Sequence, residues 1–170
     1  MFLTTNSVEE THQLGLAIGH ALQESLMISL SGDLGAGKTH LAKGIAEGMG
    51  VREDITSPTF SIVQEYRALD NSPAQKLDLY HFDLYRIMDE EELYHIGYDD
   101  YLKARGVIIL EWAENVKSSL VDDRLDISLA YTPLENQRHI SLLARGEKSE
   151  KLLKTVEAEL SGGIHENTGN

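Results

Sequence analysis

The apolar positions that follow Ser7 repeat at the spacing of an α-helix. In SVEETHQLGLAIGHALQESL, residues 7–26, Leu14, Ile18 and Leu22 recur at every fourth position, which places them on one side of a helix. Ser7 can cap the first turn, and Glu10 stands where the partner of a capping box belongs. The pattern therefore predicts a helix that begins directly after Ser7.

A short apolar run and a second helical pattern follow, separated by a glycine-rich stretch. The run LMISL, residues 26–30, is typical of a buried strand. In KTHLAKGIAEGMG, which begins at Lys38, Leu41, Ile45 and Met49 lie on one helical face, and Gly50 suits the end of a helix. We predict a strand, a glycine loop and a helix in direct succession.

The middle of the chain alternates in residue type. TFSIVQEYR, residues 59–67, and KLDLYHFDLYR, residues 76–86, each read as a strand, and together they predict an antiparallel hairpin. In the second strand, Leu79, His81 and Asp83 share one face with Leu77, so we expect an amphipathic strand. The segment DEEELYHIGYDDYL, residues 89–102, is predicted to be helical, with its acidic start in solvent.

The most continuous apolar run lies in GVIILEW, residues 106–112, where Val107–Leu110 precede Glu111. Such a run is typical of a central strand buried on both faces. Residues 124–132 and 138–146 predict a closing pair of strands, and residues 147–160 a last helix. The whole pattern predicts an α/β fold. We expect a single P-loop NTPase-like domain over residues 1–160, with a central mixed sheet flanked by helices, antiparallel hairpins, and a frayed tail over residues 161–170.

The glycine-rich stretch carries the chemistry. GDLGAGKT, residues 32–39, fits the pattern G-x-x-x-x-G-K-[ST] between a strand and a helix, which is the context of a phosphate-binding loop. Glycines let backbone N–H groups surround an anion, and the helix N-terminus adds partial positive charge. We expect Lys38 to bind the β- and γ-phosphates of ATP, and we expect the hydroxyl of Thr39 to bind Mg²⁺. The predicted nucleotide-binding residues are Asp33, Leu34, Gly35, Ala36, Gly37, Lys38 and Thr39.

Nucleotide hydrolysis also needs a metal-site carboxylate and a residue that positions water. Glu111 follows the buried run, and ligands of doubly wound sheets lie beyond the carboxyl ends of the strands. We therefore expect Glu111 near the metal that Thr39 would hold, and we name Asp83 and Glu111 as the catalytic carboxylates. His81 is as well explained by a structural role, and Trp112, the only tryptophan, by the core or by the rim of the site.

Composition and charge limit the partners. The chain has 170 residues, no cysteine and a net charge of −13, from 15 Lys and Arg against 28 Asp and Glu. Nucleic-acid binders use basic patches to neutralise phosphates, so we expect no direct binding of nucleic acid by this chain alone. No apolar run reaches the length of a membrane span, and the N-terminus lacks the features of a signal peptide. We expect a cytoplasmic protein that does not enter membranes.

Four segments in this order resemble the TsaE family, also called YjeE: GDLGAGKT at residues 32–39, SPTF at 57–60, HFDLYR at 81–86 and EW at 111–112. The resemblance implies a weak ATPase that is required for the threonylcarbamoyladenosine modification of tRNA and depends on the partner proteins TsaD and TsaB. It also implies Asp83 as the Walker-B-like carboxylate, Glu111 in the metal site and Thr59 in a switch-like segment. Arg138, in the final hairpin, is a further candidate for holding the nucleotide.

Two other functions fit the same loop. A small-molecule kinase would usually carry arginine-rich lids over the phosphates, whereas the arginines that follow the loop here are scattered. A GTPase-like switch would carry the guanine-reading N-K-x-D motif, which this sequence lacks. Both stay open as alternatives to the ATPase.

Overall fold

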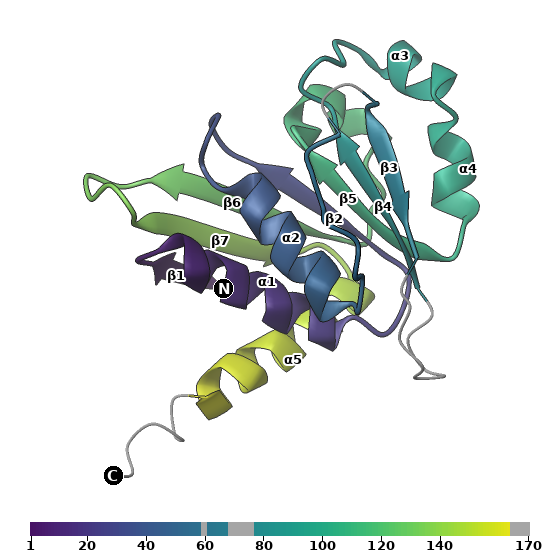
Figure 1. Ribbon diagram of the computed structural model, residues 1–170. Helices are drawn as coiled ribbons and strands as arrows, with labels where there is room; N and C mark the ends of the chain where they lie inside the picture. Colours follow the sequence, from purple (N-terminus) through teal and green to yellow (C-terminus); the bar gives the residue numbers. More distant parts are fainter. Residues whose placement is uncertain (59–60, 68–76, 164–170) are drawn as a thin grey trace, which may run out of the picture.

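The chain folds around one seven-stranded mixed sheet (Figure 1). The structure, a computed structural model, describes residues 1–58, 61–67 and 77–163. The strands lie side by side in the order β1-β7-β6-β2-β5-β4-β3. The elements are β1 (Phe2–Thr5), α1 (Val8–Ala21), β2 (Leu26–Ser31), α2 (Lys38–Gly48), β3 (Val63–Tyr66), β4 (Asp78–Asp83), α3 (Glu90–His95), α4 (Tyr98–Lys103), β5 (Gly106–Glu111), the 3₁₀-helix η1 (Ala113–Ser119), β6 (Arg124–Tyr131), β7 (Arg138–Ala144) and α5 (Glu147–Gly163).

The centre of the sheet is parallel and its edges are antiparallel. β2 pairs in parallel with both β5 and β6, and β5 pairs in parallel with β4. The antiparallel pairs are β3 with β4, β6 with β7, and β1 with β7. The predicted α/β fold with a central mixed sheet and antiparallel hairpins is confirmed. In the register of β2 with β5, Leu30 lies opposite Glu111, so the glycine loop and Glu111 emerge at the same edge.

Helices cover the central strands on both faces, which explains why these strands have no polar face. On one side, α1, α2 and α5 pack on β2, β5, β6 and β7; on the other, α3, α4 and η1 pack on β4 and β5. In Figure 1, α1 and α2 cross one face of the sheet, and α3 and α4 lie beyond its β3 end. All six residues of β5 are buried, as expected for a parallel strand between two helical layers.

Glycines bring α1 and α2 into backbone contact. A methyl group at Gly15 would lie 2.6 Å from the carbonyl oxygen of Leu41, and one at Gly19 would lie 2.2 Å from that of Ile45. Gly44 and Gly48 face the same crossing from α2, with α1 carbonyl oxygens at 2.3 and 2.4 Å. These distances are shorter than any real carbon–oxygen contact. The crossing that sets the direction of α2, and hence of the glycine loop before it, therefore depends on residues without side chains.

Two predicted helices differ from the structure. The helix expected over residues 89–102 is two short helices, α3 and α4, separated by Gly97 at φ 78°. The first helix ends at Ala21, because the following residues turn the chain into β2. The strand β1 was not predicted, since four residues are too few for a clear alternation. It extends the sheet by pairing with β7.

The predicted antiparallel hairpin of β3 and β4 is present. Its first strand is shorter than predicted, and its second strand is buried on both faces. β3 contains only Val63–Tyr66, because Ile62 has φ 66° and its N–H donates to the carbonyl oxygen of Pro58 and not to a neighbouring strand. The expectation that β4 is amphipathic was wrong. Tyr80 and Phe82 are buried as well as His81 and Asp83, because the layer of α3 and α4 covers the second face of the strand.

The C-terminal helix α5 runs to Gly163, three residues into the range expected for the tail. Residues 164–170 lie outside the described part of the chain, as do Thr59 and Phe60 of the SPTF segment, so the expectations about them stay predictions. Within the described residues, no helix is both long enough and apolar enough to cross a membrane.

Candidate functional site

The glycine loop between β2 and α2 takes a path that its glycines require. Gly32 has φ 137° and Gly37 has φ 110°, in the region that side chains disfavour. A methyl group on Gly32 would lie 2.3 Å from the carbonyl oxygen of Leu129. Ala36 is buried, while residues 33–35 are exposed at the surface. The predicted nucleotide-binding residues thus form one continuous loop at the N-terminus of α2.

The final hairpin holds this loop from the side. The hydroxyl of Tyr131 donates to the carbonyl oxygen of Leu34 at 2.8 Å, and Nε of Arg138 donates to that of Ala36 at 3.1 Å. The Arg138 guanidinium also lies 4.4 Å from the centre of the Tyr131 ring. The sequence predicted Arg138 as a candidate for holding the nucleotide; here its guanidinium donates to the loop carbonyl of Ala36 and to carbonyl oxygens of its own hairpin. Tyr131 was missed, because nothing in the sequence shows that its strand passes the loop.

Lys38 turns back into the loop. Its Nζ donates to the carbonyl oxygens of Gly32 and Asp33, at 2.5 and 2.9 Å, and lies 3.9 Å from the centre of the Trp112 ring. Only 5% of the residue is exposed. Burial lowers the pKa of Lys38, and nearby carboxylates, of which Glu111 acts most strongly, oppose that shift. The ammonium group of Lys38 therefore lies at the inner wall of the loop, beside the only tryptophan of the chain.

Thr39 and Glu111 meet across the sheet edge, as the sequence predicted. The Thr39 hydroxyl lies 3.2 Å from each carboxylate oxygen of Glu111. On its other side, Oε1 of Glu111 lies 2.8 Å from Nε2 of His81. His81 and Glu111 are both buried. His81, for which a structural and a site role both stay open, thus contacts one of the predicted site residues.

Asp83 ends β4 beside Glu111, with which it is paired in the register of the two strands. Its Oδ2 accepts a hydrogen bond from the Ser57 hydroxyl at 2.5 Å, and its Oδ1 accepts one from the N–H of Tyr85 at 3.0 Å. Ser57 belongs to the segment that precedes Thr59. Asp83 therefore joins that segment to the sheet edge where Glu111 and Thr39 lie.

These side chains line one hollow of about 470 Å³. From the glycine loop and α2 it includes Leu34, Gly35, Gly37, Lys38, Thr39 and His40, and from the facing segments Ser57, Asp83, Tyr85, Glu111 and Trp112. The structure thus brings together both predicted catalytic carboxylates and the predicted loop. Trp112 lines this hollow, contacts the Tyr85 ring at 5.0 Å between ring centres, and is half-buried against the core cluster that contains Phe82.

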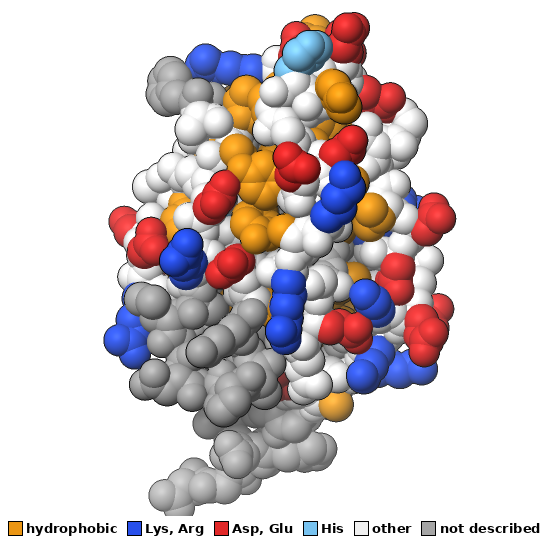
Figure 2. All heavy atoms as spheres, turned by 90° about the vertical axis from the view of Figure 1, so that its right-hand side faces the viewer, with side chains coloured by type: hydrophobic (Ala, Val, Ile, Leu, Met, Phe, Trp, Pro, Cys, Tyr) orange, Lys and Arg blue, Asp and Glu red, His pale blue; other side chains and the backbone are white. Residues whose placement is uncertain are grey.

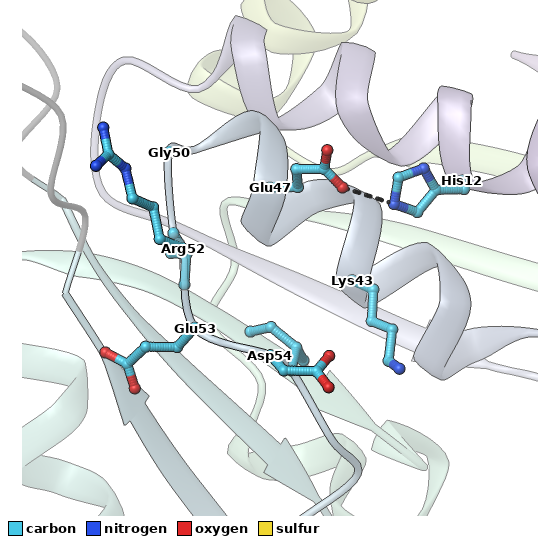
Figure 3. Close-up of a pocket in the computed structure, with 9 residues that line it drawn as sticks. His12, Lys43, Glu47, Gly50, Arg52, Glu53 and Asp54 are labelled. Atoms are coloured by element: carbon cyan, nitrogen blue, oxygen red, sulfur yellow. Dashed lines mark ion pairs between the residues drawn. The ribbon is translucent and has the colours of Figure 1, made fainter.

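A larger hollow of about 790 Å³ lies elsewhere, along α2 (Figure 3). Figure 3 shows His12 of α1 reaching toward Glu47 of α2, and their closest atoms are 3.0 Å apart. Lys43 lies on the same helix, and Arg52 and the acidic residues that follow it line the opposite wall. Cations and anions are mixed in this hollow, and it contains none of the predicted site residues. Size alone therefore does not locate the chemistry.

Known proteins similar to this chain identify its family. The family model for "Threonylcarbamoyl adenosine biosynthesis protein TsaE" matches residues 5–140. The chain belongs to the TsaE family. The tRNA threonylcarbamoyladenosine biosynthesis protein TsaE of Bacillus subtilis is 36% identical over 166 residues, which is 98% of this chain and 96% of that protein. The TsaE protein of Treponema pallidum is 37% identical over 76% of this chain and 90% of its own length.

A solved structure supports the same family. The crystal structure of YdiB from Bacillus subtilis matches with a TM-score of 0.74 and 31% sequence identity, over 94% of this chain and 95% of that one. The predicted family and fold are therefore confirmed. The name of the family connects its members with the biosynthesis of threonylcarbamoyladenosine in tRNA.

Proposed function

We propose that this TsaE-family chain is a Mg²⁺-dependent ATPase required for the threonylcarbamoyladenosine modification of tRNA, acting with TsaD and TsaB. One observation carries the proposal most directly. A glycine loop with Lys38 and Thr39 meets two buried carboxylates, Asp83 and Glu111, in a single hollow. Binding of a phosphate chain and activation of water both need these groups at one place.

The loop suits the phosphates of ATP. The N–H groups of a glycine loop that opens a helix point toward an anion, and the helix dipole adds partial positive charge. In the part of the chain that the structure describes, Lys38 has no carboxylate within ion-pair distance and donates its hydrogen bonds to two loop carbonyls. We expect it to exchange these for phosphate oxygens, which offer stronger charge-assisted hydrogen bonds.

The residues at the loop also suit Mg²⁺. This ion prefers oxygen ligands and is commonly held by one or two carboxylates together with substrate phosphates, not by a complete protein cage. The Thr39 hydroxyl and the Glu111 carboxylate offer such oxygens 3.2 Å apart. The described residues contain no cluster of three or more His, Cys, Asp or Glu that could hold a metal without them. Bound there, Mg²⁺ would neutralise developing charge on the phosphates.

The two carboxylates have different surroundings, which suggests different tasks. Glu111 faces Thr39 and would act in the metal site. Asp83 lies at the end of the neighbouring strand and accepts from Ser57 and from the N–H of Tyr85, so it would orient a water molecule or a metal-bound water. Its contact with Ser57 ties this task to the segment that leads into Thr59.

The requirement for a protein partner is supported by the surface and the charge. Tyr85, Met88 and Tyr94 are exposed apolar residues in the segment directly after Asp83. Figure 2, which shows the side of the molecule with β3, α3 and α4, has hydrophobic side chains in its middle among acidic and basic ones. A net charge of −13 suits contact with a protein better than direct contact with tRNA.

The test is ATP hydrolysis by the full chain, measured alone and with TsaD and TsaB. We expect slow phosphate release alone and faster release with both partners, without any added acceptor. Phosphate transfer to a metabolite in place of release would favour the kinase alternative. Tighter binding of GTP than of ATP, in competition on the nucleotide-free protein, would favour the switch.

A further inference from the structure

Among the described residues, His81 makes the one completely buried contact between a histidine and a carboxylate. The proposed function gives this histidine no role. Its side chain has no exposed surface, and Nε2 lies 2.8 Å from Oε1 of Glu111, whose side chain is 3% exposed. The two residues stand on adjacent parallel strands, β4 and β5, where His81 lies opposite Ile109. Both strands belong to the parallel part of the sheet, and their pairing fixes which side chains of β4 and β5 meet.

The second ring nitrogen fixes the form of this histidine. Nδ1 is buried and has no hydrogen-bond partner within residues 1–58, 61–67 and 77–163. A proton on Nδ1 would be a buried donor without an acceptor, which is costly. In the neutral tautomer that carries its proton on Nδ1, the lone pair of Nε2 would also face the carboxylate oxygen of Glu111, and the two would repel each other. A neutral ring with its proton on Nε2 avoids both penalties and donates to Glu111.

The hydrogen bond from His81 Nε2 fixes the orientation of the Glu111 carboxylate. Oε1 is held from one side by His81, and both oxygens lie 3.2 Å from the Thr39 hydroxyl on the other. A carboxylate fixed in this way accepts a hydrogen bond from the Thr39 hydroxyl. The oxygen lone pairs of Thr39 then remain directed away from Glu111, toward the hollow, where a cation would accept them.

We propose that His81 is a positioning residue for the metal site: its Nε2–H orients Glu111, and Glu111 in turn orients the Thr39 hydroxyl toward Mg²⁺. The proposal rests on the proposed function for the identity of the ligand, Mg²⁺ with ATP. Its structural half, the tautomer and the hydrogen bond, can be tested in the protein without any ligand. Partners of this kind behind a metal site typically contribute 10–100-fold to metal affinity.

The first experiment reads the tautomer directly. Nitrogen-15 NMR of the full-length, nucleotide-free protein, with the signals assigned through His81→Gln, should show one histidine with its proton on Nε2 and a bare Nδ1. A proton on Nδ1 would overturn the proposal, because the ring could not then donate to Glu111 from a neutral form.

The second experiment measures Mg²⁺ affinity by calorimetry on protein loaded with a non-hydrolysable ATP analogue, and analogue affinity in chelator. We expect His81→Leu to weaken Mg²⁺ about 10-fold or more and to leave analogue affinity without metal near the wild-type value. His81→Gln, which restores an N–H donor, should recover much of the loss. Phe82→Leu, at the neighbouring and equally buried position of β4, is the matched control that lowers stability without touching Glu111.

The outcomes separate the two proposals. If wild-type protein binds the analogue and Mg²⁺ but His81→Leu binds Mg²⁺ equally well, the role of His81 is overturned and the proposed function stands. Equal losses in Phe82→Leu and His81→Leu would also overturn it, because the effect would then come from stability alone. If the wild-type protein does not bind the analogue, the proposed function fails, and the NMR measurement still decides the contact with Glu111.

Discussion

At the scale of single residues, the site depends on a few buried charges whose partners come from distant parts of the chain. Lys38 and Glu111 are 5% and 2% exposed, and Asp83 is 6% exposed. Buried charges are tolerated only where hydrogen bonds compensate for lost hydration, and each of the three has such bonds.

Lys38→Met tests the loop. Methionine keeps most of the buried volume and removes the charge, so the chain should stay folded. Charge-assisted hydrogen bonds contribute roughly 1.5–3 kcal/mol each, and we therefore expect ATP affinity to fall at least about 10-fold. Titration of ATP against a fluorescence signal from Trp112, whose ring contacts Lys38, measures it. Unchanged affinity in a folded variant would remove Lys38 from phosphate binding.

The carboxylates should affect turnover more than binding. Asp83→Asn and Glu111→Gln preserve shape and remove charge, and charges that act mainly in the transition state raise the rate more than the affinity. We expect both variants to bind ATP and to hydrolyse it much more slowly in single-turnover experiments with TsaD and TsaB. Glu114→Gln, a nearby exposed carboxylate of η1, is the control. Wild-type rates in Asp83→Asn and Glu111→Gln would exclude these groups from the mechanism.

At the scale of elements, the glycine crossing of α1 and α2 is the feature on which the site depends. The helix N-terminus at the loop has its direction because four glycines let the two backbones touch. In an ordinary helix, alanine is more favourable than glycine by roughly 0.5–1 kcal/mol. Here the added methyl group has no space.

Gly15→Ala and Gly48→Ala should therefore destabilise the protein although alanine favours helices. Overpacked sites typically cost about 1–3 kcal/mol, and the clashes here are with backbone atoms that cannot rotate away. His40→Ala, at an exposed position of α2, should be nearly neutral. Chemical denaturation measures the free energy of unfolding, and equal stability of the Gly15→Ala protein and the wild type would show that the helices can separate.

At the scale of the whole molecule, charge contributes to stability. Asp126 of β6 accepts hydrogen bonds from Ser29 of β2, from Arg124 of its own strand and from Arg145, which lies between β7 and α5. Burial alone would raise its pKa, but these hydrogen bonds outweigh burial and lower it. A group whose folded pKa is depressed stabilises the protein above its unfolded value and loses that contribution as the pH falls through the folded value.

Asp126→Asn should accordingly lower the free energy of unfolding near neutral pH. The difference in this free energy between wild type and variant should shrink as the pH drops below about 4. Thermal unfolding across this range measures the gap. Glu157→Gln, on the exposed side of α5, is the control and should follow the wild type at every pH. A gap that stays constant down to acid would mean that the lost stability comes from packing and not from charge.

Direct binding of tRNA should be absent. With 28 acidic against 15 basic side chains, the chain alone has too few cations to release counterions from a phosphate backbone. In filter binding at low and physiological salt, we expect no complex with tRNA for this chain by itself. Salt-dependent binding by the isolated chain would contradict this expectation and the indirect role that it supports.

The hydrophobic pattern by itself determined the strand–loop–helix unit, the buried run of β5 and the closing hairpin. Each of these is encoded locally, by periodicity, by glycines at fixed spacing or by an apolar run ended by a carboxylate. It also placed Glu111 near Thr39, because the carboxyl ends of parallel strands share one edge. These predictions survived because they needed no knowledge of what packs on either side.

Only the tertiary structure decided the rest. Both faces of β4 are buried because α3 and α4 cover the second face. The alternation of residue types within β4 carries no information about that helical layer. The contact of His81 with Glu111 depends on the register of two strands, and the tethers from Tyr131 and Arg138 depend on where the last hairpin passes the loop. The need for glycine at 15, 19, 44 and 48 arises from the approach of two helices. Such features are set by contacts between segments distant in the chain, whose free energies no single segment contains.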